Sequence, residues 1–421
     1  MRILWLCNTL LPHVAERLSL PKTKPESWIS GTAEVLSARE DVELIYLFPA
    51  KAELSLTEGR THFLSYPQGS IRRLEKKQVA AFVQILRSYK PDVIHVFGTE
   101  YPHAYAMLLA AKEVGLLDAL VVHLQGLCSM IARHYFADIP FSARHGATLR
   151  DLLRRDNAYM QMLTFRRRGA LEVRALSLAR HVLGRTDFDR ATVSAINSDA
   201  NYHFVNETLR SAFYQHRWQY DACEKHSIFV SQSSYPLKGF HIVLKEMTRI
   251  LRRYPEAVLY TTGTDPRTLS PARRLRTTFY QLYLGRLLRK YRLGEHVVFL
   301  GHLNEEEMCE RYLRSHVFVS ASSLENSSNS VGEAMILGVP TVSSDVGGIS
   351  SLLSHGREGY LYPFGEPEML THYVSRIFDE KEKAERMSAL ARERALRTHD
   401  REENLTALLS TYEKLAKGDK L

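Results

Sequence analysis

The sequence is poor in cysteine, with four in 421 residues, and none of the four stands at a CxxC spacing. They are scattered along the chain as Cys7, Cys128, Cys223 and Cys309. This pattern argues against a disulfide framework and against a zinc site, and it fits a reducing compartment. We therefore expect a cytoplasmic protein.

The sequence also lacks an internal repeat and an apolar run long enough to span a bilayer. The best candidate for such a run, residues 104–122, is interrupted by three charged side chains. The first residues, MRILWLCNTLL (1–11), have only a short apolar run and no convincing cleavage site. They predict a buried first strand rather than a signal peptide.

Acidic residues are outnumbered, 47 against 56 lysines and arginines, which gives a net charge of +9. The excess is concentrated in residues 150–174 and 272–292. Three interpretations remain open for these segments: solvated helix faces, an anionic membrane surface, or a nucleic acid. Charged runs usually face water, and no recognisable nucleic-acid-binding motif is present, so no nucleic-acid partner is expected. Peripheral association with the inner face of a membrane is kept as a hypothesis.

What the sequence does contain is an alternation of strand-like and helix-like segments. Short, nearly continuous apolar runs are typical of parallel strands buried on both faces. They occupy residues 2–8, 42–48, 92–98, 119–126 and 180–186, and then 227–232, 257–263, 296–301, 316–321 and 339–344. Helical patterns lie between them, for example in residues 240–254, where apolar residues recur on one helix face. The alternation predicts an α/β fold with two doubly wound, Rossmann-like sheets.

The two series of strands are separated by residues 196–226, which are polar and aromatic with no clear strand. We interpret this segment as the connection between two domains, residues 1–205 and 206–400. Residues 401–421 then form an amphipathic helical pattern. Ligands of open α/β sheets bind at the carboxyl ends of the strands, so two such domains facing each other would form a cleft there.

The loop with the clearest chemical signal is SSLENSSNSVGEAM (322–335). An apolar strand precedes it, and a short helix follows that Gly338 and Pro340 would end. Small residues let backbone N–H groups approach a ligand, and a helix N-terminus adds unpaired donors and a positive dipole end, which suits a phosphate or diphosphate. An alternative for part of the stretch is a capping box, with Ser330 as N-cap and Glu333 reaching back to it.

This stretch, continued as ILGVPTVSSDVGG, resembles the donor-site signature of retaining glycosyltransferases with the two-Rossmann (GT-B) fold, family 4 (glycosyl transferases group 1). Residues 234–263 and 301–322 resemble further motifs of that family. The resemblance runs continuously from about Ile228 to Pro363. The first half is similar more loosely, through its strands and SWISGTAEVL (27–36).

The resemblance implies transfer of a sugar from a nucleotide-diphosphate-sugar to an acceptor hydroxyl with retention of the anomeric configuration. The implied partners are the nucleotide-sugar donor and a glycan or lipid-linked acceptor, as in polysaccharide or lipid-linked glycan assembly. No cofactor beyond this co-substrate and no metal is implied. In the family, the C-terminal tail crosses back to the first domain. Two alternatives stay open: a nucleotide-sugar epimerase, and a non-catalytic partner that binds a nucleotide-sugar.

The family's motif assigns roles to six residues of the second half. Glu325 should contact the hydroxyls of the transferred sugar and stabilise positive charge at its anomeric carbon. Lys238 should pair with the diphosphate as the leaving group becomes negative, although on its own it would pass for an ordinary solvated lysine. Glu333 should accept hydrogen bonds from the ribose hydroxyls. The distal phosphate should be held by the backbone N–H groups of Asn329, Ser330 and Val331.

The sequence departs from the family at the second diphosphate cation. Gln232 and Ser233 occupy the positions where many members have an arginine. We consider Arg185 as the substitute, because it follows a predicted first-domain strand. A structural ion pair of Arg185 with Asp187 or Asp189 is the equally weighted alternative.

Three more positions of the first half are candidates. Gln125 stands where relatives place a histidine near the transferred sugar, and its amide could bond a sugar hydroxyl. His123, two residues earlier, is expected to be a core histidine of the strand. Gly31 opens a predicted helix and would let the backbone approach the donor phosphate or the acceptor. The alternative for this last segment is an ordinary helix start with Ser30 as N-cap.

Overall fold

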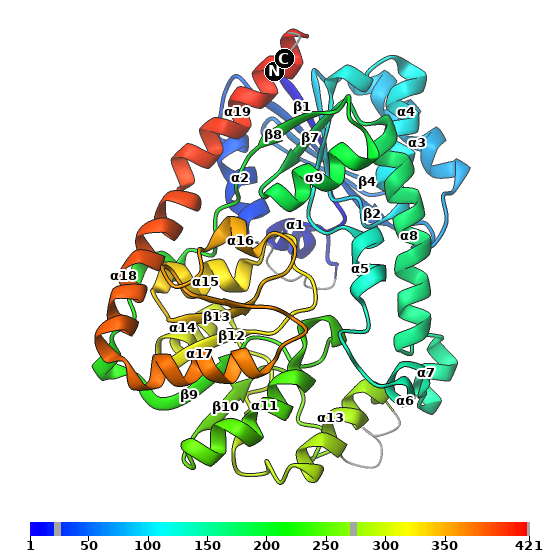
Figure 1. Cartoon of the computed structure of the whole chain (residues 1–421). Coiled ribbons are helices and arrows are strands. Elements are labelled where there is room, and N and C mark those ends of the chain that lie inside the picture. Colours follow the sequence, from blue (N-terminus) through cyan, green and yellow to red (C-terminus); the bar gives the residue numbers. More distant parts are fainter. Residues whose placement is uncertain (21–26, 270–275, 419–421) are drawn as a thin grey trace. The chain divides into compact units, whose positions relative to one another are not determined.

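The computed structural model describes residues 1–20, 27–269 and 276–418 (Figure 1). The chain divides into two compact units, each with its own sheet. Unit 1 comprises Met1–Met130, Thr164–Thr208 and Asp400–Leu421, and unit 2 comprises Ile131–Leu163 and Leu209–His399. The main difference from the expected domain ranges is the segment 131–163, which groups with unit 2 instead of with the first half of the chain.

Unit 1 contains an eight-stranded sheet with the order β3-β4-β2-β1-β5-β6-β7-β8. Neighbouring strands are parallel except for β3 and β4, which are antiparallel. In chain order the strands are β1 (Arg2–Leu6), β2 (Glu43–Ala50), β3 (Ser55–Glu58), β4 (Thr61–Pro67), β5 (Val93–Phe97), β6 (Leu120–His123), β7 (His181–Gly184) and β8 (Asn201–Phe204).

Strand β1 illustrates why this sheet is covered on both faces. Alternate residues of a strand point to opposite sides, so Leu4 and Leu6 enter one apolar cluster whereas Ile3 and Trp5 enter another. All four side chains are fully buried. The predicted buried first strand is therefore present. The helices with most of their residues in unit 1 are α1 (Pro12–Arg17), α2 (Ser27–Ser37), α3 (Lys76–Tyr89), α4 (Pro102–Val114), α8 (Ala158–Leu178), α9 (Asp187–Ile196) and α19 (Arg401–Lys417).

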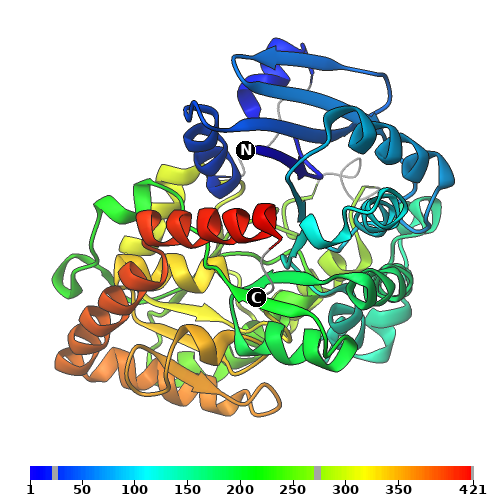
Figure 2. The same cartoon turned by 90° about the horizontal axis from the view of Figure 1, so that it is seen from above.

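The C-terminal helix α19, red in Figure 2, belongs to unit 1. Its Tyr412 is fully buried, and the hydroxyl accepts the indole N–H of Trp5 in β1 at 3.1 Å. The same hydroxyl is hydrogen-bonded to Nδ1 of His95 in β5. The last helix of the chain thus completes the core that the first strand begins.

Unit 2 contains a six-stranded, fully parallel sheet with the order β11-β10-β9-β12-β13-β14. The order runs outward from β9 in one direction and then from β12 in the other, which is the doubly wound Rossmann order. Its strands are β9 (Glu224–Val230), β10 (Val258–Thr261), β11 (Val297–Phe299), β12 (Ser315–Ser320), β13 (Thr341–Ser344) and β14 (Tyr360–Tyr362).

The helices of unit 2 include α11, which realises the predicted helix at 240–254 one residue short of its expected end. Its first five residues are all buried, and after them Glu246, Met247 and Ile250 are buried, so the single apolar face of the pattern holds only beyond the first turn. The helices with most of their residues in unit 2 are α5 (Cys128–His134), α6 (Phe141–His145), α7 (Leu149–Arg154), α10 (Ala212–Gln215), α11 (Phe240–Arg253), α13 (Phe279–Lys290), α14 (Glu305–Leu313), α15 (Asn329–Leu337), α16 (Ile349–Leu352), α17 (Glu368–Asp379) and α18 (Lys381–Thr398).

All ten predicted strands are present, but β3, β4, β8 and β14 were missed. The prediction that 196–226 holds no clear strand was wrong, because β8 lies within it. Strands β3, β8 and β14 lie at the edges of the sheets. Strands β3 and β8 have no buried residue, so the sequences of these two lack the apolar run by which buried strands are recognised.

The described residues contain no helix that is both long and apolar enough to cross a membrane. All four cysteines are buried and free. Burial raises the pKa of the Cys7 and Cys128 thiols, which keeps them protonated and unreactive. Of the second basic segment, 272–292, residues 272–275 lie outside the described residues.

Candidate functional site

Two loops meet at the carboxyl end of the unit 2 sheet, one after β9 and one after β12. These two strands are paired at the point where the strand order reverses, which is where open α/β sheets bind ligands. The first loop ends in a 3-10 turn, Pro236–Lys238, and leads into α11. The second leads into α15. They carry Lys238 and Glu325, respectively.

Gly239 allows these two loops to touch. Its φ is +66°, and a Cβ at this position would stand 1.8 Å from the carbonyl oxygen of Ala321 in the second loop. No side chain fits that space, and the left-handed backbone itself favours glycine. The glycine therefore places Lys238 directly beside the loop that follows β12.

Lys238 and Glu325 form an ion pair between the two loops, with Nζ 2.6 Å from Oε1. The hydroxyl of Ser322 donates to the same oxygen at 2.5 Å. The Glu325 side chain is only 9% exposed, so these two partners stand where water would otherwise bind the carboxylate. The two residues with predicted catalytic roles are thus brought together, and Ser322 is a partner that the sequence analysis missed.

Two glycines after β13 fix the backbone of Glu325. Gly347 has a φ of +54°, and a Cβ there would lie 2.0 Å from the Glu325 carbonyl oxygen. The N–H of Gly348 donates to the same oxygen at 3.0 Å. Gly347 is therefore required by a close backbone contact, and Gly348 contributes a backbone hydrogen bond.

Helix α15 begins at Asn329, after Ser328 in an extended conformation. No side chain in the described part of the chain caps it, and Ser330 lies inside its first turn. The alternative of a capping box between Ser330 and Glu333 is therefore wrong. The N–H groups of Asn329, Ser330 and Val331 lie in the first turn, where a helix offers no internal acceptor, so they form the positive end of α15.

Glu333 lies one turn further along α15, and its carboxylate is bound by Arg210. The guanidinium Nε of Arg210 donates to Oε1 of Glu333 at 2.7 Å. Burial raises the pKa of this carboxyl, and Arg210 opposes the rise. The guanidinium also lies over the ring of Phe213, 4.6 Å from its centroid. Glu333 is thereby held in place by a cation that the sequence analysis did not identify.

Gln125 and Arg185 lie in unit 1, where both bind the carboxylate of Glu207. The amide of Gln125 donates to Oε1 of Glu207 at 2.5 Å, and the guanidinium of Arg185 pairs with Oε2. Arg185 and Glu207 are each about 5% exposed or less. A structural ion pair of Arg185 is present, and the partner that the structure gives for its guanidinium is Glu207. The sequence analysis missed Glu207.

His123 also contacts this cluster. It is 2% exposed, and its Nε2 lies 3.4 Å from Oε1 of Glu207. Burial lowers the pKa of the imidazole, which favours its neutral form. The expectation of a core histidine is confirmed.

The prediction that Gly31 opens a helix was wrong. It is the fifth residue of α2, which already begins at Ser27, so the alternative of Ser30 as N-cap is also wrong. A Cβ on Gly31 would meet nothing within 4 Å. Space therefore does not require a glycine at this position.

A second carboxylate cluster occupies the carboxyl ends of β5 and β6 in unit 1. Glu100 follows β5 and lies against two glycines, since a Cβ on Gly98 would come 2.1 Å from its Oε2 and one on Gly126 would come 3.1 Å from its Oε1. Burial raises the pKa of Glu100 to about 7, and the neighbouring Glu172 adds to the rise. Glu172 itself accepts the N–H groups of Cys128 and Ser129.

No group of three or more His, Cys, Asp or Glu side chains in the described ranges is placed to hold a metal ion. The chain has one Asp-x-Asp pair, Asp187 and Asp189, in the first turn of α9. There Asp189 accepts the backbone N–H of Arg185 at 2.9 Å. This pair therefore supports the start of a helix.

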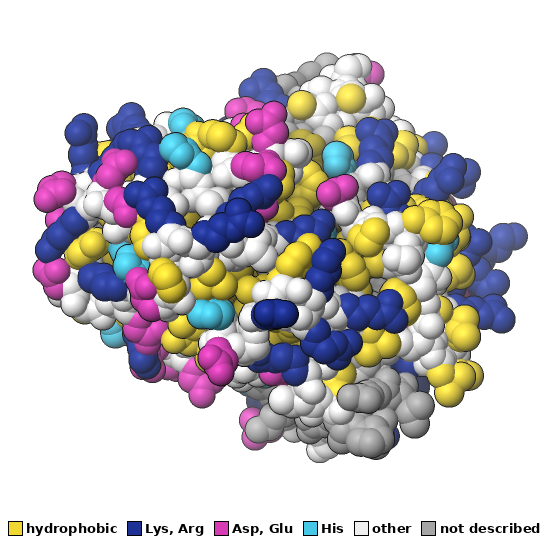
Figure 3. Space-filling model, turned by 60° about the horizontal axis from the view of Figure 1, so that its bottom comes forward, with side chains coloured by type: hydrophobic (Ala, Val, Ile, Leu, Met, Phe, Trp, Pro, Cys, Tyr) yellow, Lys and Arg dark blue, Asp and Glu magenta, His cyan; other side chains and the backbone are white. Residues whose placement is uncertain are grey.

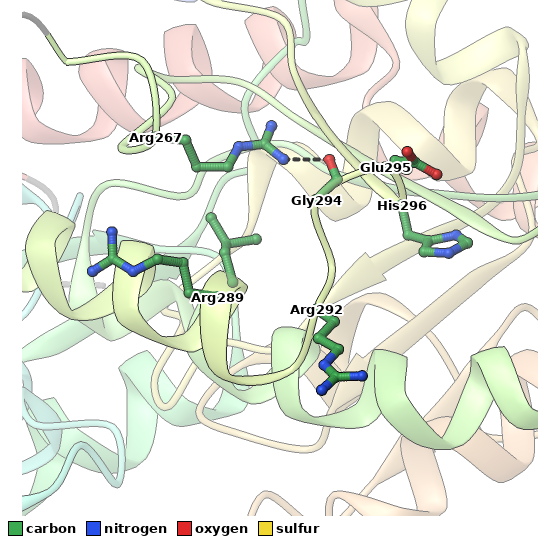
Figure 4. A pocket seen from close by; sticks show the side chains of 7 residues that line it. Arg267, Arg289, Arg292, Gly294, Glu295 and His296 are labelled. Carbon is green, nitrogen blue, oxygen red and sulfur yellow. Dashed lines mark hydrogen bonds between the residues drawn. The ribbon is translucent and has the colours of Figure 1, made fainter.

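Figure 4 shows a surface pocket of about 370 Å³ in unit 2, lined by Arg267, Arg289, Arg292, Glu295 and His296 among others. Arg267 points toward the carbonyl of Gly294 and bonds it. Residues 294–296 directly precede β11, so the pocket lies at the amino end of that strand. The loops with Lys238 and Glu325 follow the carboxyl ends of parallel strands. The pocket and the candidate site are therefore at opposite ends of the sheet.

The sequence of residues 215–394 matches the family described as Glycosyl transferases group 1. Spore coat protein SA of Bacillus subtilis is 26% identical over 193 residues, which cover 44% of this chain and 48% of that protein. The chain spans less than half the length of this and of the next two curated relatives. The matched region contains Lys238, Glu325 and all of α15.

Solved structures are similar over nearly the whole chain. Sucrose-phosphate synthase from Thermosynechococcus elongatus gives a TM-score of 0.70 at 15% identity and covers 99% of each chain. Anabaena HepE in complex with UDP and glucose gives 0.67 at 16% identity, with 98% of this chain and 99% of that chain covered. Residues 215–394 thus match Glycosyl transferases group 1, and the chain as a whole has the two-domain α/β fold of GT-B glycosyltransferase structures.

Proposed function

We propose that the chain is a retaining glycosyltransferase that uses a nucleotide-diphosphate-sugar as donor. The observation that carries the proposal is the Lys238–Glu325 pair at the switch point of the unit 2 sheet, beside the N-terminus of α15. A cation, a carboxylate and a set of backbone N–H donors are what a sugar diphosphate requires. UDP is the first nucleotide to test, because the similar HepE structure contains UDP.

The donor is bound by residues of unit 2. Backbone N–H groups of Asn329, Ser330 and Val331 hold the distal phosphate at the positive end of α15. Glu333 accepts hydrogen bonds from the two ribose hydroxyls, and Arg210 opposes the rise in its pKa that burial causes. Glu325 accepts from hydroxyls of the transferred sugar.

In the transfer step, the bond between the anomeric carbon and the distal phosphate oxygen breaks, and its electron pair stays on the nucleoside diphosphate. Lys238 stabilises the negative charge of this leaving group. Glu325 stabilises the positive charge that develops on the sugar. The acceptor oxygen bonds the anomeric carbon on the face that the phosphate leaves, and its proton passes to the departing phosphate oxygen.

Gln232 and Ser233 do not provide the second diphosphate cation, and Arg210 is engaged with Glu333. Gln232 is exposed, whereas the hydroxyl of Ser233 donates to the carbonyl of Thr262 at 2.7 Å, so neither carries charge to the site. Arg185, the substitute suggested by the sequence, is engaged with Glu207 in unit 1. Gln125 and Gly31 stay predictions for the sugar and acceptor side.

The acceptor is a glycan or lipid-linked hydroxyl, as in polysaccharide or lipid-linked glycan assembly. The first-half residues that would bind it include the strand end at 97–103, where Glu100 lies. The identity of the transferred sugar follows from which donor binds. No cofactor other than the nucleotide-sugar is proposed.

The test is a thermal-unfolding screen against UDP-, GDP-, ADP- and dTDP-sugars, because a ligand that binds the native state raises the melting temperature. We expect one nucleotide class to raise it, and Glu333→Gln to weaken that shift. If no nucleotide-sugar shifts the melting temperature, the proposal fails.

The stereochemistry is tested with the donor found in that screen. Donor turnover is followed by proton NMR, and the first product should carry the anomeric configuration of the donor. Inversion would refute retention while leaving glycosyl transfer intact. Isomerisation of the donor without an acceptor would favour an epimerase, and donor binding without turnover would favour a non-catalytic binding partner.

A further inference from the structure

An exposed apolar patch lies in unit 2, away from its sheet. It consists of five side chains from α6, α7 and the first turn of α8, which are Phe141, Leu149, Leu152, Leu153 and Tyr159 and are exposed by 74%, 59%, 65%, 78% and 36%. The described residues expose ten large hydrophobic side chains in all, and these five fall within 19 consecutive residues. Soluble proteins scatter such side chains singly, so this concentration indicates a contact surface.

Helix α7, with the sequence LRDLLR, exposes its apolar face to solvent. Leu149, Leu152 and Leu153 are spaced three and four residues apart, which places them on one face. That face is exposed, whereas Asp151 on the other side is 1% exposed. This is the reverse of the usual arrangement of a surface helix.

The inverted orientation is fixed by hydrogen bonds to Asp151 and Thr148. The Asp151 carboxylate accepts the N–H of Thr148 at 3.1 Å and that of Phe279, the first residue of α13, at 2.8 Å. The hydroxyl of Thr148 donates to the carbonyl of Thr277 at 2.8 Å. Rolling the leucines inward would break these bonds around a buried charge, so α7 presents its leucines permanently.

Two arginines at the end of α7 add positive charge to the patch. Arg154 and Arg155 are both exposed. The acidic residues of the segment 141–163 are Asp151 and Asp156, and Arg150 binds both, at 2.9 and 2.7 Å. The charge of Arg154 and Arg155 is therefore not neutralised within the segment. Figure 3 shows the face around α6 and α7, at the bottom of Figure 1, where hydrophobic and basic side chains intermingle.

We infer that this patch docks the protein on an anionic membrane surface. The leucines and Phe141 enter the boundary between head groups and acyl chains, and Arg154 and Arg155 contact lipid phosphates. A second copy of the chain is a poorer occupant, because a two-fold contact through this patch would bring the arginines of both copies together. The inference concerns unit 2 alone and does not depend on glycosyl transfer.

The experiment is co-sedimentation of the full chain with vesicles. One set contains phosphatidylcholine alone, and the other contains equal parts of phosphatidylcholine and phosphatidylglycerol. The protein should bind the anionic vesicles at low salt and should not bind the neutral ones. Leu152→Ser/Leu153→Ser and Arg154→Glu/Arg155→Glu should each reduce partition by about tenfold or more.

The matched control is Val35→Ser/Leu396→Ser, which replaces two exposed apolar residues on α2 and α18, outside the patch, 43% and 37% exposed. It should bind vesicles as the unchanged protein does. Melting temperatures without ligand show that all variants are folded, so a failure here is separable from a failure of the proposed function.

Three outcomes would overturn the inference. The first is absence of binding to anionic vesicles at low salt. The second is unchanged binding by Leu152→Ser/Leu153→Ser. The third is a concentration-dependent dimer in light scattering that Leu152→Ser/Leu153→Ser abolishes, together with no binding of any protein to vesicles. That result would assign the patch to a second copy of the chain.

Discussion

The guanidinium of Arg210 lies 2.7 Å from the carboxylate of Glu333, a residue 123 positions later in the chain. The unit 1 segment Thr164–Thr208 ends two residues before Arg210. The buried carboxylate of α15 is thus paired with a cation at the start of the unit 2 segment Leu209–His399.

Removal of Arg210 should leave the Glu333 charge buried and unpaired. We expect Arg210→Met to destabilise the protein by about 3 kcal/mol and to weaken donor-induced thermal shifts. Glu333→Gln alone should cost less, because the neutral amide tolerates burial better. Urea unfolding of both single variants and of the double variant measures the coupling, and the double should lose less than the sum. Strict additivity would contradict an energetic role for the pair.

Lys238 and Glu325 should be needed for turnover more than for folding. Lys238→Met and Glu325→Gln should each lower the rate of donor consumption by about 100-fold or more, the usual effect of losing one fixed electrostatic partner. Initial rates at saturating donor give the comparison, and the melting temperature reports on folding. Ser322→Ala serves as the control, since it removes a hydrogen bond to Glu325 and leaves both charges. Turnover at an undiminished rate in either charge variant would remove that residue from the mechanism.

Two glycines offer a matched pair of alanine substitutions. Gly239→Ala should destabilise the protein by about 2 to 4 kcal/mol, because the new Cβ would meet the Ala321 carbonyl oxygen at 1.8 Å on a left-handed backbone. Gly31→Ala should stabilise it by about 0.5 to 1 kcal/mol, because the Cβ enters open space inside helix α2. Thermal unfolding measures both. Equal effects of the two would mean that the contact between the site loops is looser than described.

Glu100 should make stability depend on pH. Its folded pKa of about 7 lies above the unfolded value near 4.5, so its contribution to stability is fully present below pH 4.5 and is lost as the pH rises through 7. Glu100→Gln removes that dependence. We therefore compare the unfolding free energy of the variant with that of the unchanged protein at pH 4.5 and at pH 7. The difference should shift in favour of the variant by about 2 kcal/mol between these two pH values. Urea unfolding at both pH values tests this, and a difference independent of pH would mean that the carboxyl is not perturbed.

The strand pattern predicted most of the fold, because buried parallel strands have continuous apolar sequences. It failed at β3, β8 and β14, which lie at sheet edges, and at β4, which pairs with β3. The inverted helix α7 was not foreseen either, since its leucines resemble those of any helix that buries its apolar face. The face that points outward is determined by the hydrogen bonds of Asp151 to Phe279 and of Thr148 to Thr277, which lie far along the chain.

The candidate site was predictable where its residues follow strands within one motif. Lys238, Glu325 and the first turn of α15 were identified through the resemblance to a family motif, whose loop position and local spacing are visible in a sequence. Arg210 and Glu207 were not, because each acts through a partner distant in the chain and lies in a segment without periodicity. The prediction that Gly31 opens a helix failed because α2 already begins at Ser27. Ser30 resembles an N-cap residue in the sequence but lies inside the helix.

The burial of Tyr412 against Trp5 and His95 also has a consequence for the order in which the chain folds during synthesis. Every strand of unit 2 has been made once Tyr362 leaves the ribosome, whereas the core of unit 1 waits for α19, which is translated after all of these strands. Unit 1 is begun before unit 2 and can be finished only after it. Until α19 is made, the sheet of unit 1 lacks the helix that covers Trp5. The apolar surface around Trp5 therefore stays uncovered while the segment Leu209–His399 of unit 2 is synthesised.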